Sequence, residues 1–235
     1  ATSNTLSADG TNTIVFTPNS AITNTCTANV MVSVTDSAST NSIVSENSIL
    51  TVNPAPTANN LLPSNTVLDS GQYVTYTVAI NGGTLPITAN LVLVSNTIPI
   101  QINGANEVPG NTVNTIVLGA GSTEPNTITF NSLLITTTNT LGGTVTFNVI
   151  AVDSASTPVT FNAVANTITV DPALAVTISP TSNTLDVGQK LSLTTTVTGG
   201  TPNFYIAYSG NGLCGTLSAT SNTLSADGTN TIVFT

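Results

Sequence analysis

Three observations predict an all-β protein made of β-sandwich modules in tandem. Short stretches of alternating apolar and polar residues are separated by clusters of Gly, Pro and Asn, and no segment keeps a helical period for three turns. Apolar residues make up 40% of the chain and charged residues only 5%. Thr, Ser and Asn supply most of the polarity, a mixture typical of strands and turns. The opening stretch, ATSNTLSADGTNTIVFT, recurs unchanged as residues 219–235.

The alternating stretches predict strands with one apolar side each. The clearest are residues 28–35 (ANVMVSVT), 73–80 (YVTYTVAI), 143–152 (GTVTFNVIAV) and 190–197 (KLSLTTTV). The residues that share one side are Val30, Val32 and Val34 in the first, Val74, Tyr76, Val78 and Ile80 in the second, Val145, Phe147, Val149 and Ala151 in the third, and Leu191, Leu193 and Val197 in the fourth. We expect these sides to form the sandwich cores.

Three pairs of segments recur in the same order, which indicates a repeated module. Residues 64–84 align with 182–201 and share a D-x-G-Q turn followed by G-G-T. TDSAST (35–40) matches VDSASTP (152–158), and ILTVNPA (49–55) matches TITVDPA (167–173). Each module therefore starts near a D-x-G-Q turn, ends with a D-S-A-S-T turn and leaves through a strand into N/D-P-A.

The order of these segments gives one whole module and two parts of another. Residues 57–172 hold a complete module, named module A, and residues 173–235 hold only the front half of a second one, module B. Residues 1–56 hold the back half of module B, with 1–17 duplicating 219–235. The two copies begin at residues 1 and 219, so the repeat period is 218 residues. Module A (116 residues) and a module B joined from 173–235 and 18–56 (102 residues) together fill that period.

We therefore expect module B to be completed across the repeat boundary, with residues 11–17 and 229–235 as strands of similar conformation. Two routes lead to this arrangement. One is a continuous polypeptide of repeats, and the other is separate subunits that insert an end strand into a neighbour's incomplete sandwich. The continuous chain is preferred, because separate subunits would make the two copies compete for one slot. Both routes relate neighbours head to tail in an open contact that propagates.

The modules resemble the bacterial immunoglobulin-like and PKD-like repeats of large archaeal and bacterial surface proteins. The resemblance is carried by VTISPTSNTLDVGQKLSLTTTVTGGTPNFYIAYSG (176–210) and VTDSAST (34–40). It covers module B well and module A more loosely, and Tyr205 or Tyr208 stands where such repeats usually have Trp. The resemblance implies tandem immunoglobulin-like β-sandwiches at a cell surface, and it names no activity.

Both cysteines, Cys26 and Cys214, belong to module B. Cys26 is in phase with Val30, Val32 and Val34, so its side chain is expected to face the core. One interpretation is an inter-sheet disulfide from Cys214 to Cys26 of the neighbouring repeat, which would stabilise the module by roughly 3–4 kcal/mol. Two buried thiols are the alternative. Metal binding by two cysteines without His is disfavoured.

Composition argues against several classes of partner. The net charge of −9 comes from ten scattered carboxylates against a single cation, Lys190. Binding to nucleic acid or to anionic lipid is therefore not expected. No apolar run reaches the roughly 18 residues that cross a bilayer, so no membrane insertion is expected within this segment. One Lys and no Arg leave trypsin-like proteases almost nothing to cut, which fits an extracellular location.

Catalysis and cofactors are not expected either. The absence of His, Arg and Trp removes the commonest general base, the phosphate clamp and the usual sugar-stacking platform. A pair of carboxylates could still serve a hydrolase. However, Asp36, Asp69, Asp153 and Asp186 lie at turns, where an Asp side chain bonds its own turn backbone. A structural calcium at a module junction is the remaining metal alternative, although no EF-hand-like run of acids is present. Its candidate ligands are Asp36, Glu46, Asp153 and Asp171.

Two functional hypotheses remain. The leading one is a structural unit of an extracellular filament, whose partner is itself in a head-to-tail homopolymer or covalent array. The alternative is an adhesin stalk with a ligand-binding loop at residues 99–124, where module A is longer than module B. The aromatic stretch 203–210 is a lesser candidate surface, because Phe204 and Ile206 are expected to face the core and only Tyr205 to face away.

Overall fold

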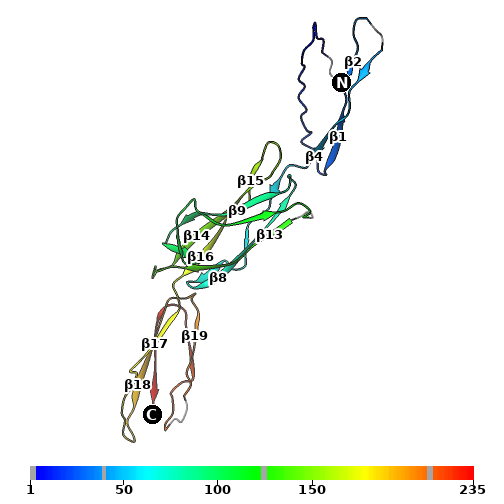
Figure 1. The fold of residues 1–235 in the computed structure, drawn as a ribbon. Helices are drawn as coiled ribbons and strands as arrows, with labels where there is room; N and C mark the ends of the chain where they lie inside the picture. Colours follow the sequence, from blue (N-terminus) through cyan, green and yellow to red (C-terminus); the bar gives the residue numbers. More distant parts are fainter. Residues whose placement is uncertain (1–3, 39–40, 123–125, 211–213) are drawn as a thin grey trace.

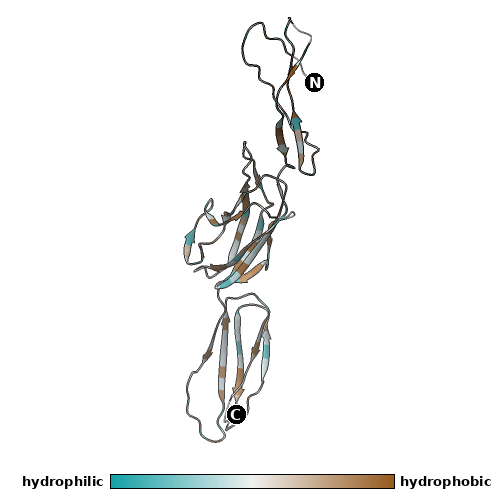
Figure 2. Ribbon diagram, turned by 45° about the vertical axis from the view of Figure 1, so that its right-hand side comes forward, coloured by the Kyte–Doolittle hydropathy of each residue, from teal (hydrophilic) through white to brown (hydrophobic). Residues whose placement is uncertain are grey.

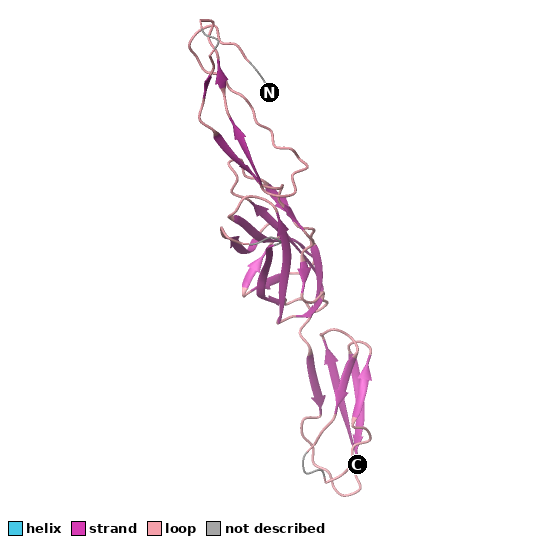
Figure 3. Ribbon diagram, turned by 90° about the vertical axis from the view of Figure 1, so that its right-hand side faces the viewer, coloured by secondary structure: helices cyan, strands magenta, loops and turns pink. Residues whose placement is uncertain are grey.

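The computed structural model describes residues 4–38, 41–122, 126–210 and 214–235. Within these ranges every regular element is a strand, so the predicted all-β fold class is confirmed (Figure 3). The strands form three groups that follow one another along the long axis of the molecule (Figure 1). The two ends of the chain lie at opposite ends of this axis.

The central group consists of two six-stranded sheets packed face to face. The strands of the first sheet are β5 (Thr57–Ala58), β6 (Leu62–Pro63), β8 (Gln72–Asn81), β10 (Ile100–Ile102), β11 (Ala105–Glu107) and β13 (Asn126–Thr136). Those of the second are β7 (Val67–Asp69), β9 (Ile87–Asn96), β12 (Thr112–Leu118), β14 (Gly143–Val152), β15 (Thr160–Asn162) and β16 (Asn166–Asp171). Their orders are β11-β10-β13-β8-β5, with β6 on β8, and β12-β9-β14-β16-β7, with β15 on β14. All of these pairs are antiparallel except β16 with β7.

The core of the central group lies between the two sheets and comes from the predicted alternation. Val74, Tyr76, Val78 and Ile80 of β8 and the alternate residues of β14 from Val145 to Ala151 are all buried. The rings of Tyr76 and Phe147 meet across the core with their centroids 5.2 Å apart. Burial raises the pKa of the Tyr76 hydroxyl.

The N-terminal group consists of two short hairpins, and its apolar residues have no second layer. Strand β1 (Cys26–Val30) pairs with β4 (Ser48–Val52), and β2 (Ser33–Val34) pairs with β3 (Ile43–Val44). No buried residue belongs to this group among those the structure describes. Figure 2 shows apolar residues on these strands, although the strands stand apart from the central group.

The C-terminal group has two small sheets around a minor core. Strands β17 (Ala175–Ser179), β18 (Leu191–Thr198) and β21 (Gly228–Phe234) form one sheet in the order β17-β18-β21. Strands β19 (Phe204–Ala207) and β20 (Ser221–Leu224) form the other. Val197, Phe204 and Ile206 are buried together, whereas Tyr205 is 71% exposed. The prediction that Phe204 and Ile206 face the core and Tyr205 faces away from it is confirmed.

The D-x-G-Q turns are closed by the Gln side chain. Gln72 Oε1 accepts a hydrogen bond from the backbone N–H of Asp69 at 3.0 Å, and Gln189 does the same for Asp186 at 2.8 Å. The glycine of the first turn, Gly71, has a φ of 96°, which side chains rarely adopt. The expectation that Asp69 and Asp186 bond their own turn backbone through their carboxylates was wrong. Their N–H groups are bonded instead.

The two identical 17-residue copies have different conformations. In the C-terminal copy, residues 228–234 form β21 and pair with β18. In the N-terminal copy, residues 11–17 form no strand, and Ile14 is 56% exposed where its counterpart Ile232 is buried. The expectation of two similar strands is therefore not met in this chain. The physical reason is that strand geometry requires a partner strand, and only the C-terminal copy lies beside one.

Candidate functional site

The back half of module B repeats the β14–β15–β16 part of module A in the same register. Cys26 lies opposite Val52 and Ala28 opposite Leu50, just as Gly143 lies opposite Val170 and Val145 opposite Ile168. Likewise, Val34 lies opposite Ile43 as Ala151 lies opposite Phe161. The N-terminal group is therefore the structural counterpart of one side of a complete sandwich.

The equivalent residues differ mainly in what covers them. Phe161 in module A is 9% exposed, whereas its counterpart Ile43 is 75% exposed. Ala151 is fully buried, whereas its counterpart Val34 is 60% exposed. Residues of this kind belong in a core. The back half of module B thus presents an apolar face without its second sheet.

The front half of module B repeats the β8–β13 pair of the first sheet and the β9–β12 pair of the second. Val197 lies opposite Gly228 in the β18–β21 pair, as Ile80 lies opposite Asn126 in the β8–β13 pair. Similarly, the β19–β20 pair corresponds to β9–β12, since Phe204 faces Leu224 as Ile87 faces Leu118.

What the front half lacks is a counterpart of β14. In module A, β9 pairs with β12 on one edge and with β14 on the other, whereas β19 pairs only with β20 among the described residues. Leu191 and Leu193 are only half-buried, although their counterparts Val74 and Tyr76 are fully buried. The back half contains the counterpart of β14, in β1 and β2, together with apolar residues that could cover Leu191 and Leu193.

The junctions between modules repeat one geometry. At the first junction, the N–H of Gly83 donates to the carbonyl of Pro54 at 2.9 Å, and at the second, Gly200 donates to Pro172 at 2.7 Å. A Cβ on Gly82 would lie 2.5 Å from the carbonyl oxygen of Ala55. The preceding N/D-P-A segment therefore packs against the G-G-T turn of each module.

A side-chain hydrogen bond accompanies each docked segment. Asn53 Nδ2 donates to Thr84 Oγ1 at 3.0 Å at the first junction. At the second, Thr201 Oγ1 lies 3.2 Å from Asp171 Oδ2 and 2.9 Å from Asp69 Oδ1. Because a hydroxyl has one proton, it donates to one of these carboxylates at a time. Both motifs are visible in the sequence, but their contact is not.

The D-S-A-S-T turn of module A clamps the same G-G-T turn. Asp153 is 6% exposed, and its Oδ1 accepts from the N–H of Val159 at 2.7 Å while its Oδ2 accepts from the N–H of Thr84 at 3.1 Å. Asp153 therefore holds β14 to the turn after β8. The counterpart in module B, Asp36, accepts a local bond from the N–H of Ala38 at 3.0 Å. For Asp36, the predicted bond to its own turn is confirmed.

The structure places the two cysteines in different groups of strands. Cys26 begins β1 in the N-terminal group, and Cys214 precedes β20 in the C-terminal group (Figure 1). Both side chains are exposed, and no disulfide joins them within the described chain. The expectation that Cys26 faces a core is not met in this chain, because the two-stranded β1–β4 sheet has no second layer over it among the described residues.

The acidic residues proposed as metal ligands do not form a metal-binding group in the described residues. The described part of the chain has no group of three His, Cys, Asp or Glu residues placed to hold a metal ion. It also contains no helix that could span a membrane. Asp36, Glu46, Asp153 and Asp171, the calcium candidates, therefore do not form such a group in the described residues.

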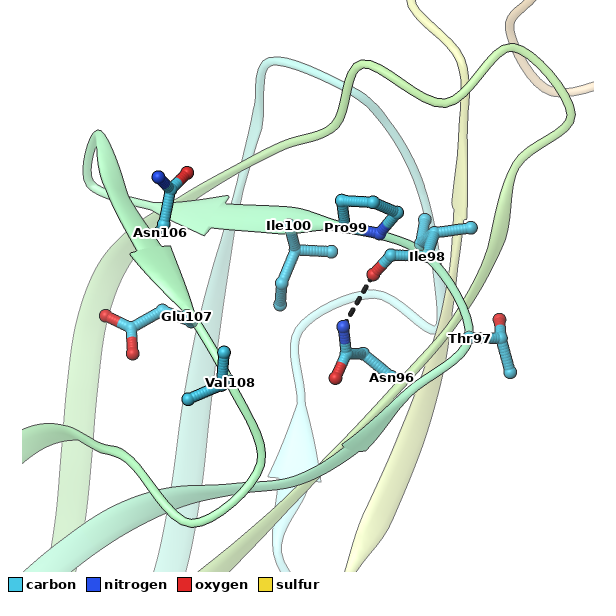
Figure 4. A pocket seen from close by; sticks show the side chains of 8 residues that line it. All are labelled: Asn96, Thr97, Ile98, Pro99, Ile100, Asn106, Glu107 and Val108. Carbon is cyan, nitrogen blue, oxygen red and sulfur yellow. Dashed lines mark hydrogen bonds between the residues drawn. The ribbon is translucent and has the colours of Figure 1, made fainter.

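A shallow pocket lies beside the extra segment of module A. It has a volume of about 550 Å³ and lies between the end of β9 and the β10–β11 hairpin (Figure 4). Asn96 Nδ2 donates to the carbonyl of Ile98 at 2.6 Å, and Asn111 Nδ2 donates to Glu107 Oε2 at 2.9 Å. In Figure 4 the Glu107 carboxylate points away from Asn96. The Asn96 and Glu107 side chains thus bond to nearby protein groups and do not converge on a common point.

No protein-family model matches this chain, and no curated protein matches it significantly.

Proposed function

We propose that this chain is a structural unit of an extracellular cell-surface filament, in which immunoglobulin-like modules follow one another head to tail. The observation that carries the proposal is the pair of open half-sandwiches at the two ends. Each half repeats, in register, a different part of module A. The two halves are complementary, and they lie too far along the chain axis to close on each other within one copy (Figure 1).

The repeated junction supports the same function. Because the N/D-P-A segment docks on the G-G-T turn at both junctions, each added module extends the chain in the same way. Heterologous contacts of this kind propagate when their rotation does not close a ring. The filament has no catalytic task in this proposal, and its working partner is another copy of the same repeat.

A disulfide between Cys214 and Cys26 of the neighbouring copy would lock the joint. Cys26 occupies the position of Gly143, and a Cβ on Gly143 would lie 2.6 Å from Thr97 Oγ1. Thr97 comes ten residues after Ile87 in β9, as Cys214 comes ten residues after Phe204 in β19. Counted in this way, the positions of the two cysteines lie beside each other in module A.

Concentration-dependent assembly of the full chain tests the filament. Sedimentation velocity should give a mass that rises with concentration without a plateau, whereas a closed monomer would keep the mass of 23.7 kDa. A monomer at every concentration would contradict the proposal. The mass of the denatured natural protein then distinguishes the two routes, since separate subunits would run near 23.7 kDa and a covalent array far above it.

An adhesin stalk is the second candidate, and the pocket beside the β10–β11 hairpin favours it. The hairpin lies within the segment of residues 99–124, where module A is longer than module B. Saturable binding of glycans to the full chain, lost when Asn106 and Glu107 are replaced by Ala, would support adhesion. Unchanged binding in that variant would place any ligand elsewhere.

A further inference from the structure

The open edge of β19 is defined by which backbone groups already have partners. The N–H of Tyr208 donates to the carbonyl of Thr220 at 2.8 Å, so the backbone of Tyr208 points towards the β20 side. Successive residues of a strand direct their backbone groups to opposite edges. The N–H and C=O of Ala207 and Tyr205 therefore point to the edge that β20 leaves open.

The back half has a matching open edge along β2. The carbonyl of Val32 accepts from the N–H of Ser45 at 2.8 Å, and the N–H of Val32 donates to Ser45 Oγ at 2.9 Å. Val32 thus points towards the β3 side. By the same alternation, the backbone groups of Ser33 point to the other edge, which has no paired strand among the described residues.

Module A shows how these two edges fit. In the β9–β14 pair, Asn90 lies opposite Ile150 and Ala89 lies opposite Ala151. Asn90 and Ile150 are the counterparts of Ala207 and Ser33, because Ile87 corresponds to Phe204 and Ala151 to Val34. The backbone directions found for Ala207 and Ser33 are those that this antiparallel pair requires.

We infer that two copies join by strand addition in one register, with β2 of one copy antiparallel to β19 of another and Ser33 opposite Ala207. This inference rests on the proposed head-to-tail filament and specifies its joint. In this register Val34 faces Ile206 and Val32 faces Tyr208, so the bare apolar side of the back half covers Leu191 and Leu193 of the front half. Asp36 comes to the G-G-T turn at Thr201, as Asp153 comes to Thr84.

The electrostatics of the two halves allow this contact. The back half carries Asp9, Asp36 and Glu46, and the front half carries Asp186, Asp227 and Lys190. None of these residues lies in β1, β2, β18 or β19. Apart from Asp36 at the G-G-T turn, the joint therefore buries apolar side chains and backbone groups, and its strength should depend little on salt.

Proline at the open edge is the direct test, carried out on the full chain. Ala207→Pro removes the N–H that β2 would accept, while leaving the N–H groups that serve β20. Sedimentation velocity should show association weakened by about tenfold or more. Ala207→Val, which keeps the N–H and suits a strand, should associate like the unmodified chain. Ser33→Pro against Ser33→Thr repeats the comparison from the other half, so that a local folding defect in one half cannot decide the result.

Cross-linking tests the register itself. In a background with Cys26→Ser and Cys214→Ser, chains carrying Ser33→Cys and Ala207→Cys are oxidised with a small-molecule disulfide. Opposite residues in a bonded pair lie about 5.5 Å apart at Cα, within the range of a disulfide. Interchain cross-links are expected for this pair and not for Ser33→Cys with Tyr205→Cys, which is displaced by two residues.

The outcomes separate the inference from the filament proposal. If the proline variants associate like their controls, or if the displaced cysteine pair cross-links equally well, the inferred register is wrong and the filament proposal stands. If even the unmodified chain does not associate, the filament proposal fails and the inference fails with it.

Discussion

Replacing Asp153 tests whether the D-S-A-S-T turn holds the module together. In Asp153→Ala, the N–H groups of Val159 and Thr84 both lose their acceptor. Val159 is 43% exposed and Thr84 is half-buried. Each lost bond should therefore cost about 0.5–1.5 kcal/mol, the net worth of an ordinary hydrogen bond, and module A should lose about 1–3 kcal/mol of its unfolding free energy. Asp153→Asn keeps one acceptor oxygen and should lose roughly half of that.

Hydrogen exchange read by mass spectrometry suits this test, because it resolves the three groups of strands separately. Peptides from β8 and β14 should exchange between about 5-fold and 150-fold faster in Asp153→Ala. Asp36→Ala is the matched control, since it changes the same motif in the back half and should leave these peptides unaffected. Acceleration below about threefold in Asp153→Ala would refute the clamp.

Three further substitutions test the glycines of the turns and the minor core of the C-terminal group. Gly82→Ala should destabilise module A by more than about 2 kcal/mol, because its φ is 68° and its Cβ would meet the Ala55 carbonyl at 2.5 Å. Gly71→Ala, with nothing within 4 Å, should cost only about 1 kcal/mol, and equal thermal shifts would contradict the close packing at Gly82. Thr195→Val should stabilise β18 by about 1 kcal/mol, since its buried Oγ1 lacks a partner in the described structure. Faster exchange of β18 peptides would count against this.

The strands could be predicted where the sequence alone decides which side is apolar. Residues 72–81 and 143–152 alternate strictly, and they form β8 and β14 with the expected sides buried. The alternation at 28–34 also forms strands, but Val32 and Val34 on its apolar side are exposed. Period-two alternation specifies which residues share a face, whereas burial depends on whether a second sheet is present.

The contacts of the site were harder to predict than its elements. The N/D-P-A and G-G-T motifs are both visible in the sequence, yet Asn53 and Thr84 meet only because the chain folds β5 back on β8. In the D-x-G-Q turn, Asp and Gln can each bond the same backbone, and sequence cannot choose between them. The duplicated 17-residue stretch could not be predicted from its own sequence either. One sequence has two conformations, because only the C-terminal copy lies beside β18.

The parallel pairing of β7 with β16 has a mechanical consequence. Val67, Leu68 and Asp69 of β7 lie beside Thr169, Val170 and Asp171 of β16, with both strands running the same way. In the proposed array, tension would enter module A at its first strands and leave it at β16, so it would pull β7 and β16 in opposite directions. The hydrogen bonds between the two strands are then loaded in shear and share the force. They must rupture together rather than peel one at a time, and this short pair is the place where a stretched module would resist.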